Sequence, residues 1–409
     1  MIATRRPAVP AARRFGAALA AVLVLVVLAL AGAVPALGQG SATFDPPTAS
    51  GALGTPLHYA TTLRSAVEPV RIELLTRLKA DPTLLVDDAA VTAIGGDAYE
   101  ARVVDTSHIA PNSTFLYRFR ATFPDGTTVE SPEASVTVAD ERYDWKTRSN
   151  GVVTLHWYEG DEAFADRALQ IGSAAIEKAA KLLGVTDMPP VDFFIYADQS
   201  AFYDALGPGT RENVGGQANS SIGTMFGLIT PGEVDSDWVD TLVSHELTHL
   251  VFAEAVRNPY HFPPRWLNEG VAVHMSTGLE DGDRADVAAA ARAGTIIPLE
   301  GLAGLFPTQR DRFSLAYAES SSAVDFLVST YGEETLAKLI TSYAQGRTDD
   351  EAFTEALGMD MRGFDDAWLA SVGATRPSPF GPQPAPPGPV PAAWASPGAS
   401  PAATSAPVG

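Results

Sequence analysis

The chain has 409 residues, of which 46% are hydrophobic, so two or three globular domains with a sizeable core are possible. Its 28 basic and 49 acidic residues give a net charge of −21, and this acidity, without a basic cluster, argues against nucleic acid or an anionic membrane surface as a partner. Cysteine is absent, which excludes disulfides, thiolate metal sites and a lipid-modified cysteine anchor.

Residues 1–39 have the pattern of an export segment. Four arginines among the first 14 residues are followed by an unbroken apolar run over residues 15–33 and by small residues as far as Gly38. This pattern is typical of a secretory signal peptide, but the run is also about long enough to cross a bilayer as an uncleaved N-terminal anchor. Both interpretations predict a secreted or extracytoplasmic protein whose membrane contact, if it has one, is this segment. Cleavage after Gly38 would leave 24 basic against 49 acidic residues, a net charge of −25.

Residues 41–140 are predicted to form a β-sandwich domain. Short runs of strand-forming residues are separated by turn sequences such as Pro-Asp-Gly at residues 124–126. Strands at this spacing are typical of immunoglobulin-like or fibronectin-like sandwiches. The histidines of this domain are isolated and lack ligand spacing, so we predict no chemistry here. The predicted strands are residues 70–74, 99–104, 115–120 and 135–138.

Residues 151–374 are predicted to form an α+β domain, after a polar, turn-like boundary at residues 140–150. A few strands followed by a run of helices indicates α+β rather than alternating α/β architecture. The domain therefore has a small sheet and a helical C-terminal half. Eleven of the 31 prolines lie among the last 33 residues, so we predict that residues 375–409 form a disordered tail rich in Pro, Ala and Ser. The predicted strands are 152–157 and 191–196, with one or two more expected within 215–229 and the strongest signal at 224–229. The predicted helices are 161–183, 200–206, 238–254, 265–277, 284–293, 314–331, 333–345, 349–357 and 364–372.

The strongest chemical signal is the H-E-x-x-H pattern of His245, Glu246 and His249 in an apolar, helix-periodic segment. Residues four apart share one face of a helix, so the two histidines can direct their imidazoles at one ion. Glu246 lies about 100° further round the helix, where it can reach a metal-bound water but is not placed as a third ligand. A hydrolytic zinc usually has three protein ligands and one open position. The candidate for the third ligand is Glu269, which lies 20 positions after His249 in a second amphipathic segment.

The H-E-x-x-H pattern, followed by Trp-Leu-Asn-Glu-Gly at residues 266–270, resembles the gluzincin zinc metallopeptidases, in particular the M1-like peptidases of the MA clan. The resemblance covers residues 152–372. It implies one Zn²⁺ ion held by His245, His249 and Glu269, with Glu246 as the general base that activates the zinc-bound water. The segment around Tyr317 resembles the family segment whose tyrosine stabilises the oxyanion of the tetrahedral intermediate, so Tyr317 is a second catalytic candidate.

Two departures from the family pattern bear on activity. In many such enzymes a carboxylate one helical turn after the ligand glutamate supports the first histidine, but that position here is Val273. M1 aminopeptidases also carry a Gly-Ala-Met-Glu-Asn segment on the edge strand of the sheet, and its glutamate captures the free amine of the substrate. The edge strand expected here, residues 223–229, has no acid. An endopeptidase or a broader amide hydrolase is therefore favoured over strict N-terminal exopeptidase action.

The sequence as a whole predicts an exported zinc metallopeptidase that acts on a peptide or protein substrate. An M1-type aminopeptidase is the narrower alternative within the same class. The alternative from another class is a cell-surface binding protein whose peptidase-like domain is inactive and whose sandwich binds the partner. The presence of three ligands, a general base and a tyrosine favours the enzyme. The sequence carries no signal for the oligomeric state.

Overall fold

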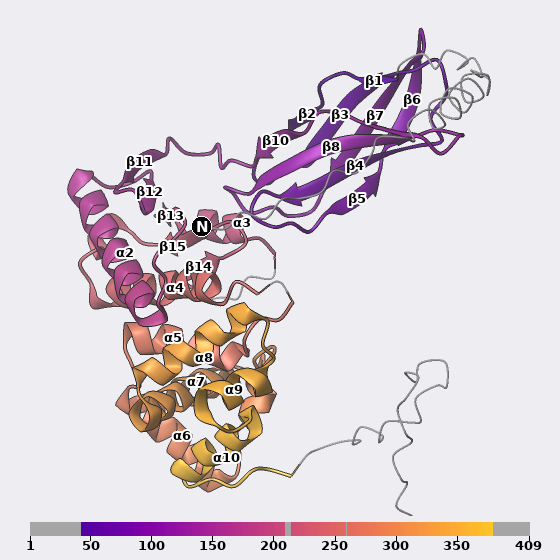
Figure 1. The fold of residues 1–409 in the computed structure, drawn as a ribbon. Coiled ribbons are helices and arrows are strands. Elements are labelled where there is room, and N and C mark those ends of the chain that lie inside the picture. The colour runs from indigo at the N-terminus through magenta and orange to yellow at the C-terminus, as the bar shows by residue number, and fades with distance from the viewer. Residues whose placement is uncertain (1–41, 209–213, 259, 379–409) are drawn as a thin grey trace, which may run out of the picture. The chain divides into compact units, whose positions relative to one another are not determined.

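The computed structural model describes residues 42–208, 214–258 and 260–378, which divide into two units (Figure 1). The first unit comprises the chain up to Asp144 together with Tyr203–Arg211, and the second comprises Trp145–Phe202 and the chain from Glu212 onward. The predicted export segment, residues 1–39, lies outside the described residues, as does the predicted tail from residue 379. Among the described residues, no helix is long and apolar enough to cross a membrane.

The first unit is a sandwich of two antiparallel sheets, which confirms the predicted fold. One sheet has the strand order β1-β3-β7-β6, with β2 also paired to β3, and the other has the order β10-β8-β4-β5, with β9 also paired to β8. This division of strands is the one found in immunoglobulin-type sandwiches. Alternate side chains of both sheets point inward and share one core, which includes Leu63, Ile72 and Phe119. The strands are β1 Thr43–Phe44, β2 Thr48–Ser50, β3 Leu57–Arg64, β4 Arg71–Leu78, β5 Leu85–Asp88, β6 Ala90–Gly95, β7 Ala98–Asp105, β8 Thr114–Thr122, β9 Thr128–Glu130 and β10 Ala134–Thr137.

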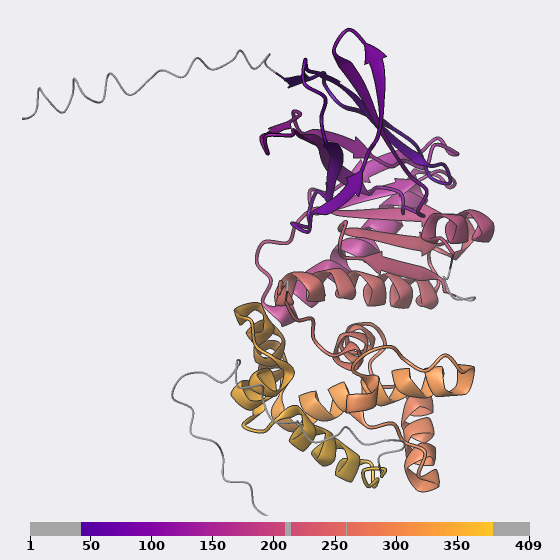
Figure 2. The ribbon, with the colours of Figure 1, turned by 90° about the vertical axis from the view of Figure 1, so that its right-hand side faces the viewer.

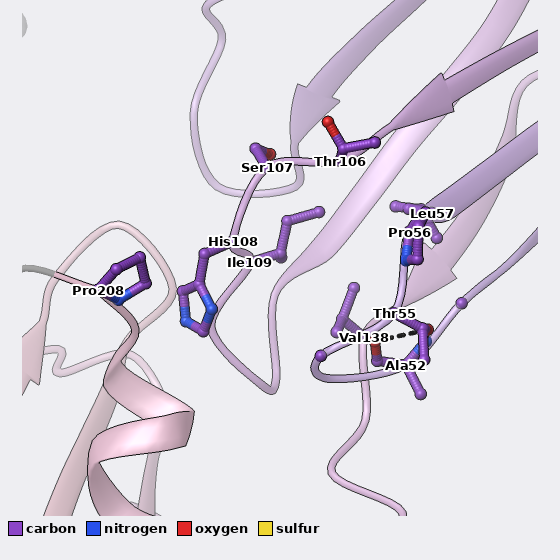
Figure 3. A pocket seen from close by; sticks show the side chains of 12 residues that line it. Ala52, Thr55, Pro56, Leu57, Thr106, Ser107, His108, Ile109, Val138 and Pro208 are labelled. Atoms are coloured by element: carbon purple, nitrogen blue, oxygen red, sulfur yellow. Dashed lines mark hydrogen bonds between the residues drawn. The ribbon is translucent and has the colours of Figure 1, made fainter.

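Loops of the first unit line a pocket around Thr55, His108 and Val138 (Figure 3). His108 is the one titratable side chain among the described residues that line it. A single histidine without a second ligating or catalytic group cannot form a metal site or an acid–base pair. Its described lining therefore contains neither a group of metal ligands nor an acid–base pair.

The second unit contains a mixed sheet with the strand order β11-β12-β13-β15-β14. Strands β12, β13 and β15 are parallel to one another, and β11 and β14 pair antiparallel at the two edges. The expected edge strand was wrong, because β15 lies inside the sheet and β14 forms the edge. The predicted boundary at residues 140–150 also contains a strand, β11. The strands are β11 Lys146–Ser149, β12 Val153–Trp157, β13 Val191–Tyr196, β14 Gly216–Asn219 and β15 Thr224–Leu228.

Helices α2 and α4 lie side by side on one face of this sheet (Figures 1 and 2). At their crossing a Cβ on Gly172 of α2 would lie 3.4 Å from Leu247 of α4 and 3.7 Å from Phe193 of β13. Helix α3 follows β13, and helices α5 to α10 form the C-terminal half, which confirms the predicted α+β class. The helices are α2 Glu162–Leu183, α3 Gln199–Leu206, α4 Asp237–Val256, α5 Arg265–Ser276, α6 Asp281–Ala293, α7 Arg310–Tyr331, α8 Glu333–Ser342, α9 Asp349–Leu357 and α10 Met361–Ser371, with short 3₁₀ turns at Pro231–Glu233, Leu299–Leu302 and Tyr343–Gln345.

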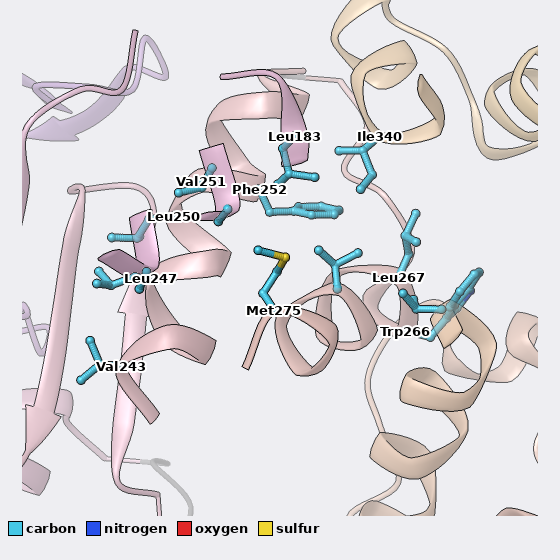
Figure 4. Packing of buried hydrophobic residues seen from close by; sticks show 14 of the residues in the cluster. Leu183, Val243, Leu247, Leu250, Val251, Phe252, Trp266, Leu267, Met275 and Ile340 are labelled. Atoms are coloured by element: carbon cyan, nitrogen blue, oxygen red, sulfur yellow. The ribbon is translucent and has the colours of Figure 1, made fainter. Parts of the chain in front are cut away.

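An apolar core packs behind α4 and α5 (Figure 4). The buried residues of α4 recur every three to four positions, as in Val243, Leu247 and Val251, so this face of the helix turns toward the core. Helix α5 contributes Leu267 and Met275 to the same core. Because this packing fixes the rotation of both helices about their axes, it also fixes the directions in which their other side chains point.

Candidate metal centre

Helices α4 and α5 bring the three predicted ligands together. His245 and His249 lie one turn apart on α4, and their Nε2 atoms are 3.2 Å from each other. The Oε2 atom of Glu269, in the second turn of α5, lies 3.5 Å from each of these nitrogens. Ligand atoms placed about 2.0–2.1 Å from a tetrahedral zinc are about 3.3–3.4 Å apart. Among the described residues, this is the one group of three ligating side chains that could hold a metal ion.

The carboxylate of Glu269 provides a test of whether a cation fits here. Glu269 is only 6% exposed, and its Oε2 atom is buried without a hydrogen-bond partner among the described residues. A buried carboxylate oxygen without a partner is unfavourable by about 1–3 kcal/mol or more. That oxygen faces two imidazole nitrogens, which can bind a metal ion when the rings are neutral. The donor set of two nitrogens and one oxygen fits Zn²⁺ and leaves a position for a further ligand.

The charges of the site are strongly coupled when no metal is bound. Burial by itself lowers the pKa of His249, but the nearby carboxylate of Glu269 and the charge of Glu246 raise it to about 9. Burial likewise raises the pKa of Glu269, yet the nearby imidazoles of His245 and His249 hold it well below its usual range. The metal-free site is therefore a carboxylate paired with protonated imidazole, and a metal ion must displace that proton.

Two side chains on α5 orient the ligands. The Nδ1–H of His249 donates to Oδ1 of Asn268 at 3.0 Å, which turns Nε2 toward the site. Arg265 donates to the other oxygen of Glu269, Oε1, at 3.1 Å. His245 has no such support, since no hydrogen bond to its Nδ1 is found among the described residues, and Val273 stands where the family has a carboxylate.

The edge strand β14 holds the predicted general base. The backbone N–H of Ala218 donates to Oε2 of Glu246 at 2.8 Å. This close approach depends on Gly216, because a Cβ there would lie 2.9 Å from Cγ of Glu246. The residues of β14 are Gly-Gln-Ala-Asn, so the true edge strand, like the one expected, contains no acid that could bind a substrate amine.

Tyr317 of α7 lies beside the ligands. Its ring centroid is 6.5 Å from that of His245, and the ring packs against Phe306 at 5.3 Å and Phe313 at 5.0 Å. Burial and the charge of Glu269 raise the pKa of Tyr317 well above its usual value. The phenol therefore stays protonated and can donate a hydrogen bond at the site.

Residues 171–374 match the model of the Peptidase MA superfamily. This match places residues 171–374 in that superfamily. This confirms the family that the two sequence motifs predicted. Among solved structures, the chain is similar to an aminopeptidase N family protein from Idiomarina loihiensis, with 11% identity, a TM-score of 0.44 and coverage of 82% of this chain and 76% of that one. It is also similar to an M1 zinc metallopeptidase from Deinococcus radiodurans, with 12% identity, a TM-score of 0.37 and coverage of 85% and 95%. No curated protein matches the sequence.

Three groups at the site were not expected from the sequence. Arg265 lies four positions before Glu269 on one helix, so the spacing of an i,i+4 ion pair could have revealed it. Asn268 is adjacent to Glu269, and the Asn-Glu-Gly segment of the family is the signal that points to it. The N–H of Ala218 has no signal in the sequence, since any residue offers the same backbone group.

Three other histidines of the second unit lie apart from the site. His156 contacts Asp192 at 2.7 Å, and its ring stacks on Phe194 at 4.1 Å. His261 contacts Asp349 at 2.7 Å, and His274 lies 4.0 Å from Glu333. Each is paired with a single carboxylate, so none completes a group of three ligands.

Proposed function

We propose that this chain is a zinc metallopeptidase that hydrolyses internal peptide bonds of peptide or protein substrates. The observation that carries the proposal is the buried, unpartnered Oε2 of Glu269, which faces the Nε2 atoms of His245 and His249 at 3.5 Å. We infer that these three side chains hold one Zn²⁺ ion. When bound, the zinc supplies positive charge and Lewis acidity for the carbonyl group of the scissile bond.

Glu246 is the proposed general base. Its carboxylate accepts a proton from the attacking water as the water oxygen bonds to the carbonyl carbon. The same carboxyl group then passes this proton to the amide nitrogen, the C–N bond breaks and the amine leaves. The N–H of Ala218 donates to Oε2 of Glu246 at 2.8 Å, a hydrogen bond that helps to hold this carboxylate in place.

Tyr317 is the proposed hydrogen-bond donor to the carbonyl oxygen as that oxygen gains negative charge. Its raised pKa supports this role, because only the protonated phenol can donate. Donors aimed at a developing oxyanion typically contribute about 10²–10³ in kcat.

An internal cleavage site is favoured because β14 has no acidic side chain that would hold a free N-terminus. In the described part of the chain β14 pairs with β15 on one side only, so its other edge is available to pair with an extended peptide. We also propose that the enzyme acts outside the cytoplasm, which rests on the export pattern of residues 1–39.

The test uses Glu246→Gln in the full chain. We expect this variant to bind zinc stoichiometrically by metal analysis. Its rate of cleavage of a peptide library, followed by mass spectrometry, should fall by about 10²–10⁴-fold. Glu254→Gln, two turns further along α4 and ion-paired with Arg257, is the matched control and keeps full activity. Undiminished cleavage by Glu246→Gln would refute the mechanism. Substoichiometric zinc in the native protein, with no chelator-sensitive cleavage of any peptide, would instead indicate an inactive binding protein.

A further inference from the structure

We propose that Arg265 is a positioning residue that restricts Glu269 to a single ligating oxygen and so keeps one coordination position of the metal open. The inference rests on the proposed zinc site. It concerns a residue that touches neither metal nor substrate and acts through Glu269, and whose charge also acts on Tyr317.

Arg265 binds only one of the two oxygens of Glu269. Arg265 is the first residue of α5, four positions before Glu269, and both its Nε and Nη2 lie 3.1 Å from Oε1. An arginine that faces a carboxylate commonly binds both oxygens, one with each nitrogen. Here both nitrogens meet one oxygen. The other, Oε2, is left without a hydrogen bond and faces the two histidines.

Arg265 is itself held in place by two contacts. Its guanidinium lies over the ring of Phe306 at 4.7 Å, a cation–π contact. Its backbone N–H donates to the carbonyl of Ala303 at 2.8 Å, which anchors the start of α5 to the loop that carries Phe306. An anchored guanidinium keeps its two N–H groups directed at Oε1 instead of rotating away into water.

Arg265 and Tyr317 both pack against Phe306. Phe306 packs edge-on against the Tyr317 ring at 5.3 Å, so one aromatic ring supports both side chains. The positive charge of Arg265 also offsets part of the rise in the pKa of Tyr317. One guanidinium thus acts on both the third proposed ligand and the proposed oxyanion donor.

The consequence concerns the coordination of the metal. A carboxylate with both oxygens available can bind a metal through one or two of them, and two would take the position that a hydrolytic site keeps open. With Oε1 bound to Arg265, Glu269 offers Oε2 alone. The positive charge of Arg265 also stabilises the buried carboxylate of Glu269, whose side chain is 8% exposed.

The test compares Arg265→Met and Arg265→Lys with the wild type in the full chain. We expect Arg265→Met to lower zinc affinity by about 10–100-fold in competition with a chromogenic chelator. The visible spectrum of the Co²⁺-substituted protein should change, because its intensity depends on coordination number. At saturating zinc, kcat should fall while KM changes little. Lysine keeps the charge but cannot place two nitrogens on one oxygen, so it should restore only part of the affinity.

Arg284→Met is the matched control, since Arg284 of α6 forms an exposed ion pair with Asp325 of α7 at 3.3 Å. This variant should leave all readouts unchanged. A folded Arg265→Met protein with wild-type zinc affinity and an unchanged Co²⁺ spectrum would overturn this inference alone. If Arg265→Met does not fold, Arg265→Lys decides, and wild-type zinc affinity and spectrum in that variant overturn the inference. Absence of zinc binding in the wild type would overturn the proposed function and this inference together.

Discussion

Replacing Gly270 by alanine is predicted to force helices α5 and α7 apart. A Cβ on Gly270 would lie 2.4 Å from the carbonyl oxygen of Ser320 and 2.6 Å from Cγ2 of Val324. Non-bonded heavy atoms at their preferred separation are about 3.5 Å apart, so the overlap with a backbone atom is about 1 Å. Overpacking of this kind costs about 1–3 kcal/mol, which lowers Tm by about 2–12 °C in a domain of this size.

Tryptophan fluorescence can follow this effect in the second unit alone. All six tryptophans lie at or beyond residue 145, outside the sandwich, so a thermal or denaturant transition read from them excludes the first unit. Gly282→Ala is the matched control, because Gly282 is also helical, in α6, but no atom lies within 4 Å of its added Cβ. That variant should gain about 0.4–1 kcal/mol, since alanine loses less backbone freedom on folding.

The two alanine variants should therefore shift stability in opposite directions. Gly270 directly follows Glu269, so the same displacement should also weaken zinc binding in Gly270→Ala but not in Gly282→Ala. A Gly270→Ala protein as stable as the wild type, with the same zinc affinity, would show that α5 and α7 are not held at the distance described.

Two further predictions address the chemistry of the site. Tyr317→Phe should bind zinc as the wild type does and keep the same KM, but its kcat should fall by about 10²–10³-fold, measured by steady-state cleavage of a fluorogenic peptide. An unchanged kcat would exclude the phenol as an oxyanion donor. Zinc binding at pH 7 should release a proton, because the pKa of His249 in the metal-free site is raised to about 9, above the solution pH, and binding requires the neutral ring. The apparent zinc affinity should accordingly fall by about tenfold per pH unit as the pH drops below 9, and titration calorimetry in buffers of different ionisation enthalpy should detect the proton. Zinc binding without proton release would contradict the pairing of His249 with Glu269.

Local signals in the sequence were sufficient for the helices that carry the site. The helical repeat places His245 and His249 on one face, and the apolar residues of α4 determine which face is buried. Helix α9 begins and ends where predicted, at Asp349 and Leu357, because Thr348 and Glu351 form a capping box, which depends only on neighbouring residues. Glu269 was the candidate for the third ligand from its place in a second amphipathic segment 20 positions after His249, and the family resemblance then implied the same role.

Contacts between distant segments decided the rest. The Gly-Gln-Ala-Asn sequence of β14 has little intrinsic preference for a strand, and it becomes the edge strand because β15 pairs with it and α4 packs against it. Only that placement brings the N–H of Ala218 to Glu246. The same holds for Arg265, whose position four residues before Glu269 suggests an ion pair but not which oxygen it binds. That choice follows from where Phe306 and the two histidines lie, because side-chain direction at a buried site is set by packing and charge from elements far apart in the chain.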